Sequence, residues 1–189
     1  MSKRTQIVCI HEGTRGASID PVFVNSFFKA YNPEWIRPWG TSKIRLVPKG
    51  GKTELQAEFP KELKNVLRAG ADTTLVVFAD IDEKIETGDE LRELYWKKAQ
   101  ENDISRDDFD KVVFIFSKDR IENWIQFLQT GNTDESVEGP RINNNSEARD
   151  AAQKLAEMCL SGKSTFPFPP SLQWSCKNWH QLLNRMKNN

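Results

Sequence analysis

The sequence lacks the features that define several large classes of protein. Its three cysteines, Cys9, Cys159 and Cys176, are odd in number and widely spaced, which favours neither a disulfide framework nor a zinc site. We expect three reduced thiols in a cytoplasmic protein. No segment approaches the roughly 20 apolar residues that a membrane-spanning helix needs, so no membrane association is expected. The apolar run near the N-terminus is also too short for a secretory signal.

The chain also lacks an excess of charge of either sign. Its 189 residues contain 27 Lys and Arg against 27 Asp and Glu, which excludes a nucleic-acid binder that relies on bulk positive charge. A local concentration of charge is not excluded by this balance. Only 38% of the residues are hydrophobic, yet 11 Phe and 6 Trp argue against a disordered chain. The length suits one compact domain, or one domain with a short appendage.

Strand-like and helix-like segments alternate over the first two thirds of the chain. Residues 73–79 and 111–116 are almost continuously apolar, which is typical of strands buried on both faces of a parallel sheet. Pro60 is expected to kink or divide one of the helices. The pattern predicts an α/β, Rossmann-like fold with a parallel four-stranded sheet flanked by helices. The expected strands are 6–11, 43–47, 73–79 and 111–116, and the expected helices begin at 20 and span 53–68, 89–102 and 117–129.

The composition of the chain changes after residue 130. Residues 130–145 form a polar, turn-rich segment, and Ser146 has the character of a capping residue for a helix that runs to residue 160. A connector rich in Phe and Pro leads to a last helix that begins at Ser171. We therefore expect a domain over residues 1–130 that carries the site, and a helical C-terminal extension over residues 131–189 that packs on it.

Acidic residues follow three of the four expected strands. Glu12 comes after the first, Asp80 and Asp82 after the third, and Glu122 opens the helix after the fourth. Ligands of parallel α/β sheets bind outside the carboxyl ends of the strands, where these carboxylates would repel one another. A bound cation resolves that repulsion, and oxygen ligands suit Mg²⁺ or Mn²⁺. Because alternate side chains of a strand point the same way, we expect Asp80 and Asp82 to face one metal.

These residues resemble the Toprim domain, the metal-dependent module shared by topoisomerases, primases and OLD-like nucleases. The resemblance rests on a strand that ends in Glu12-Gly13 and on Asp80-Ile81-Asp82 after a buried strand. A Gly50-Gly51-Lys52 turn and an Ile121-Glu122-Asn123-Trp124 segment also match the small OLD-like nucleases of phage defence. The resemblance covers roughly residues 6–130. The sequence departs from the family pattern because no Asp follows Glu12-Gly13 at the usual spacing, and Asp20 comes later.

The resemblance implies a Mg²⁺- or Mn²⁺-dependent nuclease that hydrolyses DNA or RNA. Glu12 would be a metal ligand or general acid/base, Asp80 and Asp82 the metal-binding pair, Glu122 a further acidic ligand, and Lys118 a lysine near the scissile phosphate. A role in anti-phage defence and a partner ATPase of the ABC type are also implied, since the chain has no Walker A motif of its own. The oligomeric state is left open. Residues expected to meet phosphate or nucleic acid are Arg15, Gly50, Gly51 and Lys52, with Lys49 nearby.

Other interpretations stay open. Glu122 is favoured in the first turn of a helix by the helix dipole alone, and Gly50-Gly51 also fits a simple tight turn. Asp80-Ile81-Asp82 occurs in other metal-dependent enzymes of phosphoryl or glycosyl transfer. A catalytically silent interaction module is a third hypothesis, in which Trp35, Trp39 and the C-terminal helix bind a partner.

Overall fold

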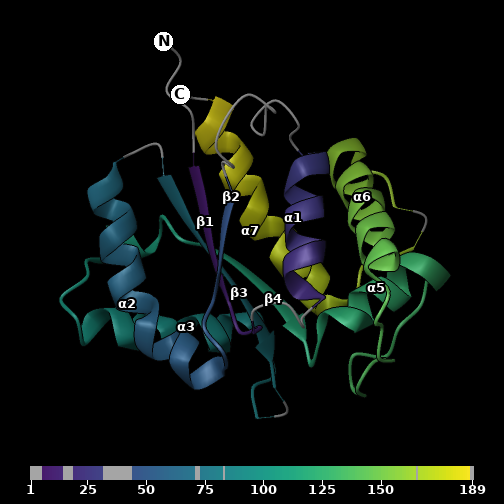
Figure 1. The fold of residues 1–189 in the computed structure, drawn as a ribbon, viewed down its shortest axis with the longest axis horizontal. Helices are drawn as coiled ribbons and strands as arrows, with labels where there is room; N and C mark the ends of the chain where they lie inside the picture. Colours follow the sequence, from purple (N-terminus) through teal and green to yellow (C-terminus); the bar gives the residue numbers. More distant parts are fainter. Residues whose placement is uncertain are drawn as a thin grey trace.

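The computed structural model describes residues 6–14, 19–31, 44–70, 73–82, 84–164 and 166–187. Strands and helices alternate along the chain and form three layers, with helices on both faces of one sheet (Figure 1). The strands are β1 (Gln6–His11), β2 (Ile44–Pro48), β3 (Thr73–Ile81) and β4 (Val113–Lys118). The helices are α1 (Asp20–Tyr31), α2 (Lys52–Ala69), α3 (Gly88–Gln100), α4 (Arg106–Phe109), α5 (Ile121–Thr130), α6 (Asn145–Ser161) and α7 (Pro170–Lys187).

The sheet has the order β2-β1-β3-β4, and its strands are all parallel. The predicted parallel four-stranded α/β sheet is thereby confirmed. From β1 the chain crosses to β2 on one side and then returns to β3 on the other side of β1. The order of strands therefore reverses between β1 and β3, and a crevice opens at such a point beyond the carboxyl ends of the two strands.

Alternating side chains of the strands divide the core into two parts. Ile7, Cys9, Val76 and Phe78 pack with α1, α5, α6 and part of α7. Val8, Ile10, Leu75 and Val77 face α2, α3 and α4 on the other side. Because β3 is covered on both faces, its sequence reads as one apolar run rather than as an alternating pattern.

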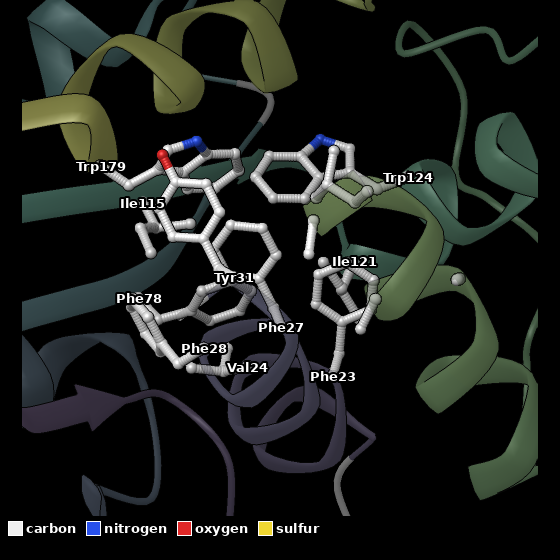
Figure 2. Close-up of a cluster of buried hydrophobic side chains, with 14 of the residues drawn as sticks. Phe23, Val24, Phe27, Phe28, Tyr31, Phe78, Ile115, Ile121, Trp124 and Trp179 are labelled. Carbon is white, nitrogen blue, oxygen red and sulfur yellow. The ribbon is translucent and has the colours of Figure 1, made fainter. Parts of the chain in front are cut away.

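Large aromatic side chains fill the face that carries α1. Figure 2 shows Phe23, Phe27 and Tyr31 of α1 pointing toward Trp124 of α5 and Trp179 of α7. The rings of Phe27 and Trp179 lie 4.5 Å apart, and Trp124 meets Trp179 edge to face at 6.2 Å. These rings join α1 to the C-terminal half of the chain. A second aromatic group, which includes Phe59, Tyr95 and Phe114, packs on the other face of the sheet.

Helix α7 runs along the outer edge of β4 and supplies hydrogen bonds that a further strand would otherwise make. The Ser175 hydroxyl accepts a hydrogen bond from Phe116 N at 2.9 Å and donates one to Phe116 O at 3.0 Å. The Ser171 hydroxyl accepts from Lys118 N at 3.3 Å and from Trp124 Nε1 at 2.8 Å. Both serines are buried, so the exposed edge typical of a terminal strand is closed here by side chains.

Several expected boundaries differ from the structure. β3 continues to Ile81 and β4 to Lys118, so α5 begins at Ile121 rather than at residue 117. Pro60 is buried inside α2 and does not divide it. The cap of α6 is Asn144, whose side chain accepts from Ser146 N, and the short α4 was not predicted. Among the described residues, no helix combines the length and the apolar character needed to cross a bilayer.

Candidate functional site

A pocket of about 430 Å³ lies at the point where the strand order reverses. Its walls come from the ends of β1, β3 and β4, from the first residues of α1 and α5, and from the segment that precedes α6. Five of the lining residues are acidic, and one, Arg120, is basic. The pocket is lined by Glu12, Gly13, Thr14, Ile19, Asp20, Asp80, Asp119, Arg120, Glu122, Ile142 and Asn143.

The strand ends position Glu12 and Asp80 against each other. Asp80 is still within β3, beside Ser117 of β4, and its Oδ1 accepts a hydrogen bond from the Ser117 hydroxyl. Glu12 follows β1 directly, and its Oε1 accepts from Asp80 N at 3.1 Å. His11 shapes the turn, since its Nδ1 accepts from Gly13 N at 3.2 Å and burial lowers the pKa of its ring. The two carboxylates are therefore held by the sheet itself.

Two helices begin at the pocket and add further carboxylates. Asp20 is the first residue of α1, and Glu122 lies in the first turn of α5. Between β4 and α5 the chain turns through Asp119, whose φ is 59°, a left-handed conformation that Asp tolerates better than most residues. The Asp119 N–H donates to Ile81 O at 2.9 Å, which ties this turn to the end of β3.

The carboxylates of the pocket share a shift in pKa. Burial raises the pKa of Asp80 well above its usual range, and the charges of Asp20, Glu12 and Glu122 add to the effect against the hydrogen bond from Ser117. Burial also raises the pKa of Glu12 and of Glu122, and the charge of Asp20 raises both further. The protein therefore keeps several carboxyl groups in a place where their charged forms are disfavoured.

Asp82 does not share these surroundings. β3 ends at Ile81, so the alternation expected to turn both aspartates the same way stops before Asp82. Its Oδ2 accepts from Lys52 Nζ at 2.5 Å, and this bond lowers the pKa of Asp82. Asp82 does not line the pocket. The expectation that Asp80 and Asp82 face one metal is therefore not met.

The expected basic residues are mostly engaged elsewhere. Lys118 Nζ donates to the carbonyls of Asp82 and Ile85, at 3.1 and 2.8 Å, and so holds the segment after β3. Lys49 pairs with Glu62 at 2.6 Å. Neither lysine lines the pocket. Arg15 lies outside the described residues, as do Trp35 and Trp39.

Gly50 and Gly51 form the turn between β2 and α2. Gly50 has a φ of 80°, which a residue with a side chain rarely adopts, and its N–H donates to Gly13 O at 3.2 Å. The turn therefore supports the backbone next to Glu12. It does not line the pocket.

Sequence reasoning missed three charged residues of the pocket. In the sequence, Asp20 is considered only where the chain departs from the family pattern, and neither Asp119 nor Arg120 is singled out. The available signal was their position, since each lies at a junction that leads into α1 or α5 at the carboxyl end of the sheet. Arg120 also pairs with Glu138, which ties the segment before α6 to the pocket.

The donor chemistry of the pocket fits a hard cation. Among the described residues, no group of three or more His, Cys, Asp or Glu side chains is arranged to hold a metal ion. Mg²⁺ does not need such a cage, because it keeps several waters and binds through one or two carboxylates together with substrate phosphate. Asp80 and Glu12 are the carboxylates best placed to hold it.

Comparisons with family models, with curated proteins and with solved structures give no match for this chain. Its function is therefore inferred from the pocket at the β1/β3 crevice.

Proposed function

We propose that the protein is a Mg²⁺-dependent nuclease that hydrolyses phosphodiester bonds of DNA or RNA in a Toprim-like acidic pocket, with Mn²⁺ as a substitute ion. The observation that carries this proposal is the convergence of Glu12, Asp20, Asp80 and Glu122 at the point where the strand order reverses. Helix dipoles favour acids at the starts of α1 and α5, but they do not explain Glu12 and Asp80, which come from strand ends.

A cation accounts for the electrostatics of the strand-end pair. A buried carboxylate with a raised pKa costs folding free energy at neutral pH unless a positive charge compensates it. Among the described residues, the one basic side chain that lines the pocket is Arg120, and it is paired with Glu138. A divalent ion held by Asp80 and Glu12 would offset the repulsion that the fold maintains.

The same pocket suits a phosphate group. The N-termini of α1 and α5 border it, and the backbone N–H groups at the start of a helix favour an anion. Ser117 orients Asp80 by its hydrogen bond, and Glu12 is placed to take a proton from an attacking water. A bound Mg²⁺ supplies charge stabilisation for the phosphate and lowers the pKa of bound water. Arg120 can hold a phosphate oxygen if it leaves Glu138.

The test is cleavage of plasmid DNA and of single-stranded RNA by the purified protein with Mg²⁺ or Mn²⁺. Asp80→Asn and Glu12→Gln keep the size of each side chain but remove its charge. We expect each to lower the rate by at least about 100-fold, the order contributed by a positioned acid–base group. Asp107→Asn, an exposed position on α4, is the matched control and should cleave like the wild type.

A measurement of metal binding tests the cation site separately from the cleavage reaction. Mg²⁺ should raise the melting temperature of the wild type and of Asp107→Asn, but not that of Asp80→Asn. If the wild type cleaves neither nucleic acid, alone or with an ABC-type ATPase from the same genome, or if the Asp80 and Glu12 variants cleave as fast as the wild type, the nuclease proposal is wrong. Metal-dependent hydrolysis of a nucleotide sugar or a small phosphate ester would instead favour the other class of metal-dependent transfer enzyme.

The resemblance to small OLD-like nucleases extends the proposal to the protein's setting. On this basis we propose that the protein acts in an anti-phage system together with an ABC-type ATPase, in the cytoplasm that its reduced thiols suggest. Cleavage that appears only when such an ATPase is added would support this part. If an ABC-type ATPase from the same genome neither binds the chain nor changes its activity, the proposal of an ATPase partner is wrong. The proposal of a nuclease site in the acidic pocket does not depend on this result.

A further inference from the structure

Two of the three cysteines lie face to face in the C-terminal part of the molecule. Cys159 of α6 and Cys176 of α7 have their sulfur atoms 3.5 Å apart. Each is 8% exposed, whereas Cys9 in the middle of β1 is 0% exposed. Cys159 and Cys176 are therefore buried but keep a small contact with solvent, whereas Cys9 has none. Neither member lines the acidic pocket.

One neighbour of the pair, Trp179, favours the thiolate form. The indole N–H of Trp179 is buried and has no hydrogen-bond partner among the described residues, although it lies close enough to lower the pKa of both thiols. A thiolate would supply the acceptor that this donor lacks. The Tyr31 hydroxyl of α1 lies 3.4 Å from His180 Nδ1 of α7, and its pKa is raised by burial and by the charges of Cys159 and Cys176. Figure 2 shows Tyr31 and Trp179 together at one side of the aromatic core.

Cys159 is the member of the pair that loses its proton more easily. A hydrogen bond from the Cys176 thiol lowers the pKa of Cys159, because it stabilises the thiolate form. The same interaction, together with burial, raises the pKa of Cys176. We assign the attack on the oxidant to Cys159 and the completion of the reaction to Cys176.

We propose that Cys159 and Cys176 are a redox modification site, in which hydrogen peroxide converts the two facing thiols into a disulfide that joins α6 to α7. The sulfur atoms need to approach from 3.5 Å to the roughly 2.05 Å of a disulfide bond. The two sulfur atoms already face each other, so the bond needs a further approach of about 1.5 Å.

The chemistry balances in two steps. In the first, the Cys159 thiolate forms an S–O bond with peroxide, the O–O bond breaks, and the leaving hydroxide takes a proton to become water. In the second, the Cys176 sulfur attacks the sulfenic acid, the S–S bond forms, the S–O bond breaks, and a second water leaves with the remaining thiol proton. Two thiols are oxidised by two electrons, and one peroxide is reduced to two waters.

The experiment is to treat the folded protein with hydrogen peroxide and to map its disulfides by trypsin digestion and mass spectrometry. The three cysteines fall in separate tryptic peptides, 5–15, 155–163 and 164–177, so the expected bond links two identifiable fragments. We expect the 155–163 and 164–177 peptides to be linked, and the link to disappear when a dithiol reductant is added. Cys9→Ala should form the same link, and Cys159→Ser and Cys176→Ser should form none.

A second measurement guards against cysteine variants that fold poorly. Oxidation should raise the melting temperature of the wild type and of Cys9→Ala, because the new bond restrains the unfolded chain. Oxidised wild type that contains no 155–163 to 164–177 link overturns the proposal, as does a link to the 5–15 peptide of similar abundance. A link that forms only after the protein is unfolded in urea also overturns it. All of these outcomes are independent of nuclease activity.

Discussion

At the scale of the residue, Asp80 and Asp82 show how the place of an aspartate relative to the end of a strand decides the direction of its pKa shift. Asp80 is inside β3, surrounded by protein and near other acids, so its pKa is raised. Asp82 is outside the strand and bonded to Lys52, so its pKa is lowered. The two residues have the same side chain and opposite electrostatic roles.

The free energy of unfolding should therefore respond to pH in opposite ways in two variants. A raised pKa means that the folded state holds a proton that the unfolded state releases, so wild-type stability falls as the pH rises above about 4. Asp80→Asn removes this loss and should become more stable relative to the wild type between about pH 4 and pH 7.

Asp82→Asn should do the reverse. A carboxyl with a lowered pKa adds stability above its ordinary pKa and loses that stability as the pH falls through the lowered value. The variant should be less stable than the wild type at neutral pH, and the difference should vanish in acid. Urea unfolding at several pH values measures both effects, with Asp107→Asn as the unchanged reference. Shifts of the same sign in the two variants would refute the assignment.

At the scale of the element, Ser175 is one of the two serines that join α7 to β4. Its hydroxyl satisfies both the N–H and the carbonyl of Phe116, and the side chain is fully buried. Ser175→Ala leaves two buried backbone groups without partners, and we expect the free energy of unfolding to fall by about 1–3 kcal/mol. The exchange of the Phe116 amide hydrogen should also become faster.

Ser136→Ala provides the comparison. Its hydroxyl is bonded to Asp134 on the exposed segment between α5 and α6, and loss of that bond should change stability by less than about 0.5 kcal/mol. If Ser175→Ala also lowers the free energy of unfolding by less than about 0.5 kcal/mol, closure of the β4 edge contributes nothing to stability.

The elements themselves were largely predictable, because their apolar patterns are strong. β1 was predicted with the bounds that it has, and the start of β3 was also correct. The ends of β3 and β4 were not, since Asp80 and Lys118 are charged and read as loop residues. Each is satisfied by a partner distant in sequence, Ser117 for Asp80 and the carbonyls after β3 for Lys118. Such pairing cannot be read from local patterns.

At the scale of the whole molecule, the boundary expected at residues 130 and 131 cuts through a shared core. Trp124 and Phe27 pack with Leu155 of α6 and with Leu172 and Trp179 of α7. Each large apolar side chain contributes about 1.5–3 kcal/mol on burial, so the five named here account for about 7.5–15 kcal/mol. This is comparable with the roughly 5–15 kcal/mol that typically holds a domain together.

A fragment that ends at Thr130 should therefore fail to fold. We expect it to lack the near-ultraviolet circular dichroism of packed aromatic rings and to show no cooperative unfolding in urea. The full chain under identical conditions is the control. Cooperative unfolding of the fragment would instead establish residues 1–130 as an independent domain.

The pocket lies at the edge of the sheet where carboxylates were expected to gather, and three of the four expected acids line it. Glu12, Asp80 and Glu122 meet at the predicted edge of the sheet, because topology alone brings strand ends together. Asp20, Asp119 and Arg120 were not predicted, since their places depend on where α1 and α5 begin. Lys52 and Lys118 were expected near phosphate, and their bonds to the segment after β3 come from side-chain geometry that spacing does not report.

The closure of β4 by α7 has a consequence for how the chain is made. A ribosome releases β4 well before α7, so for an interval the nascent sheet ends in a strand whose outer backbone groups are unpaired. During that interval another nascent chain can pair with the same edge. Slow translation between residues 118 and 170, or crowding of ribosomes on one message, should therefore favour aggregation, and a chaperone that covers β4 would oppose it until the serines of α7 arrive.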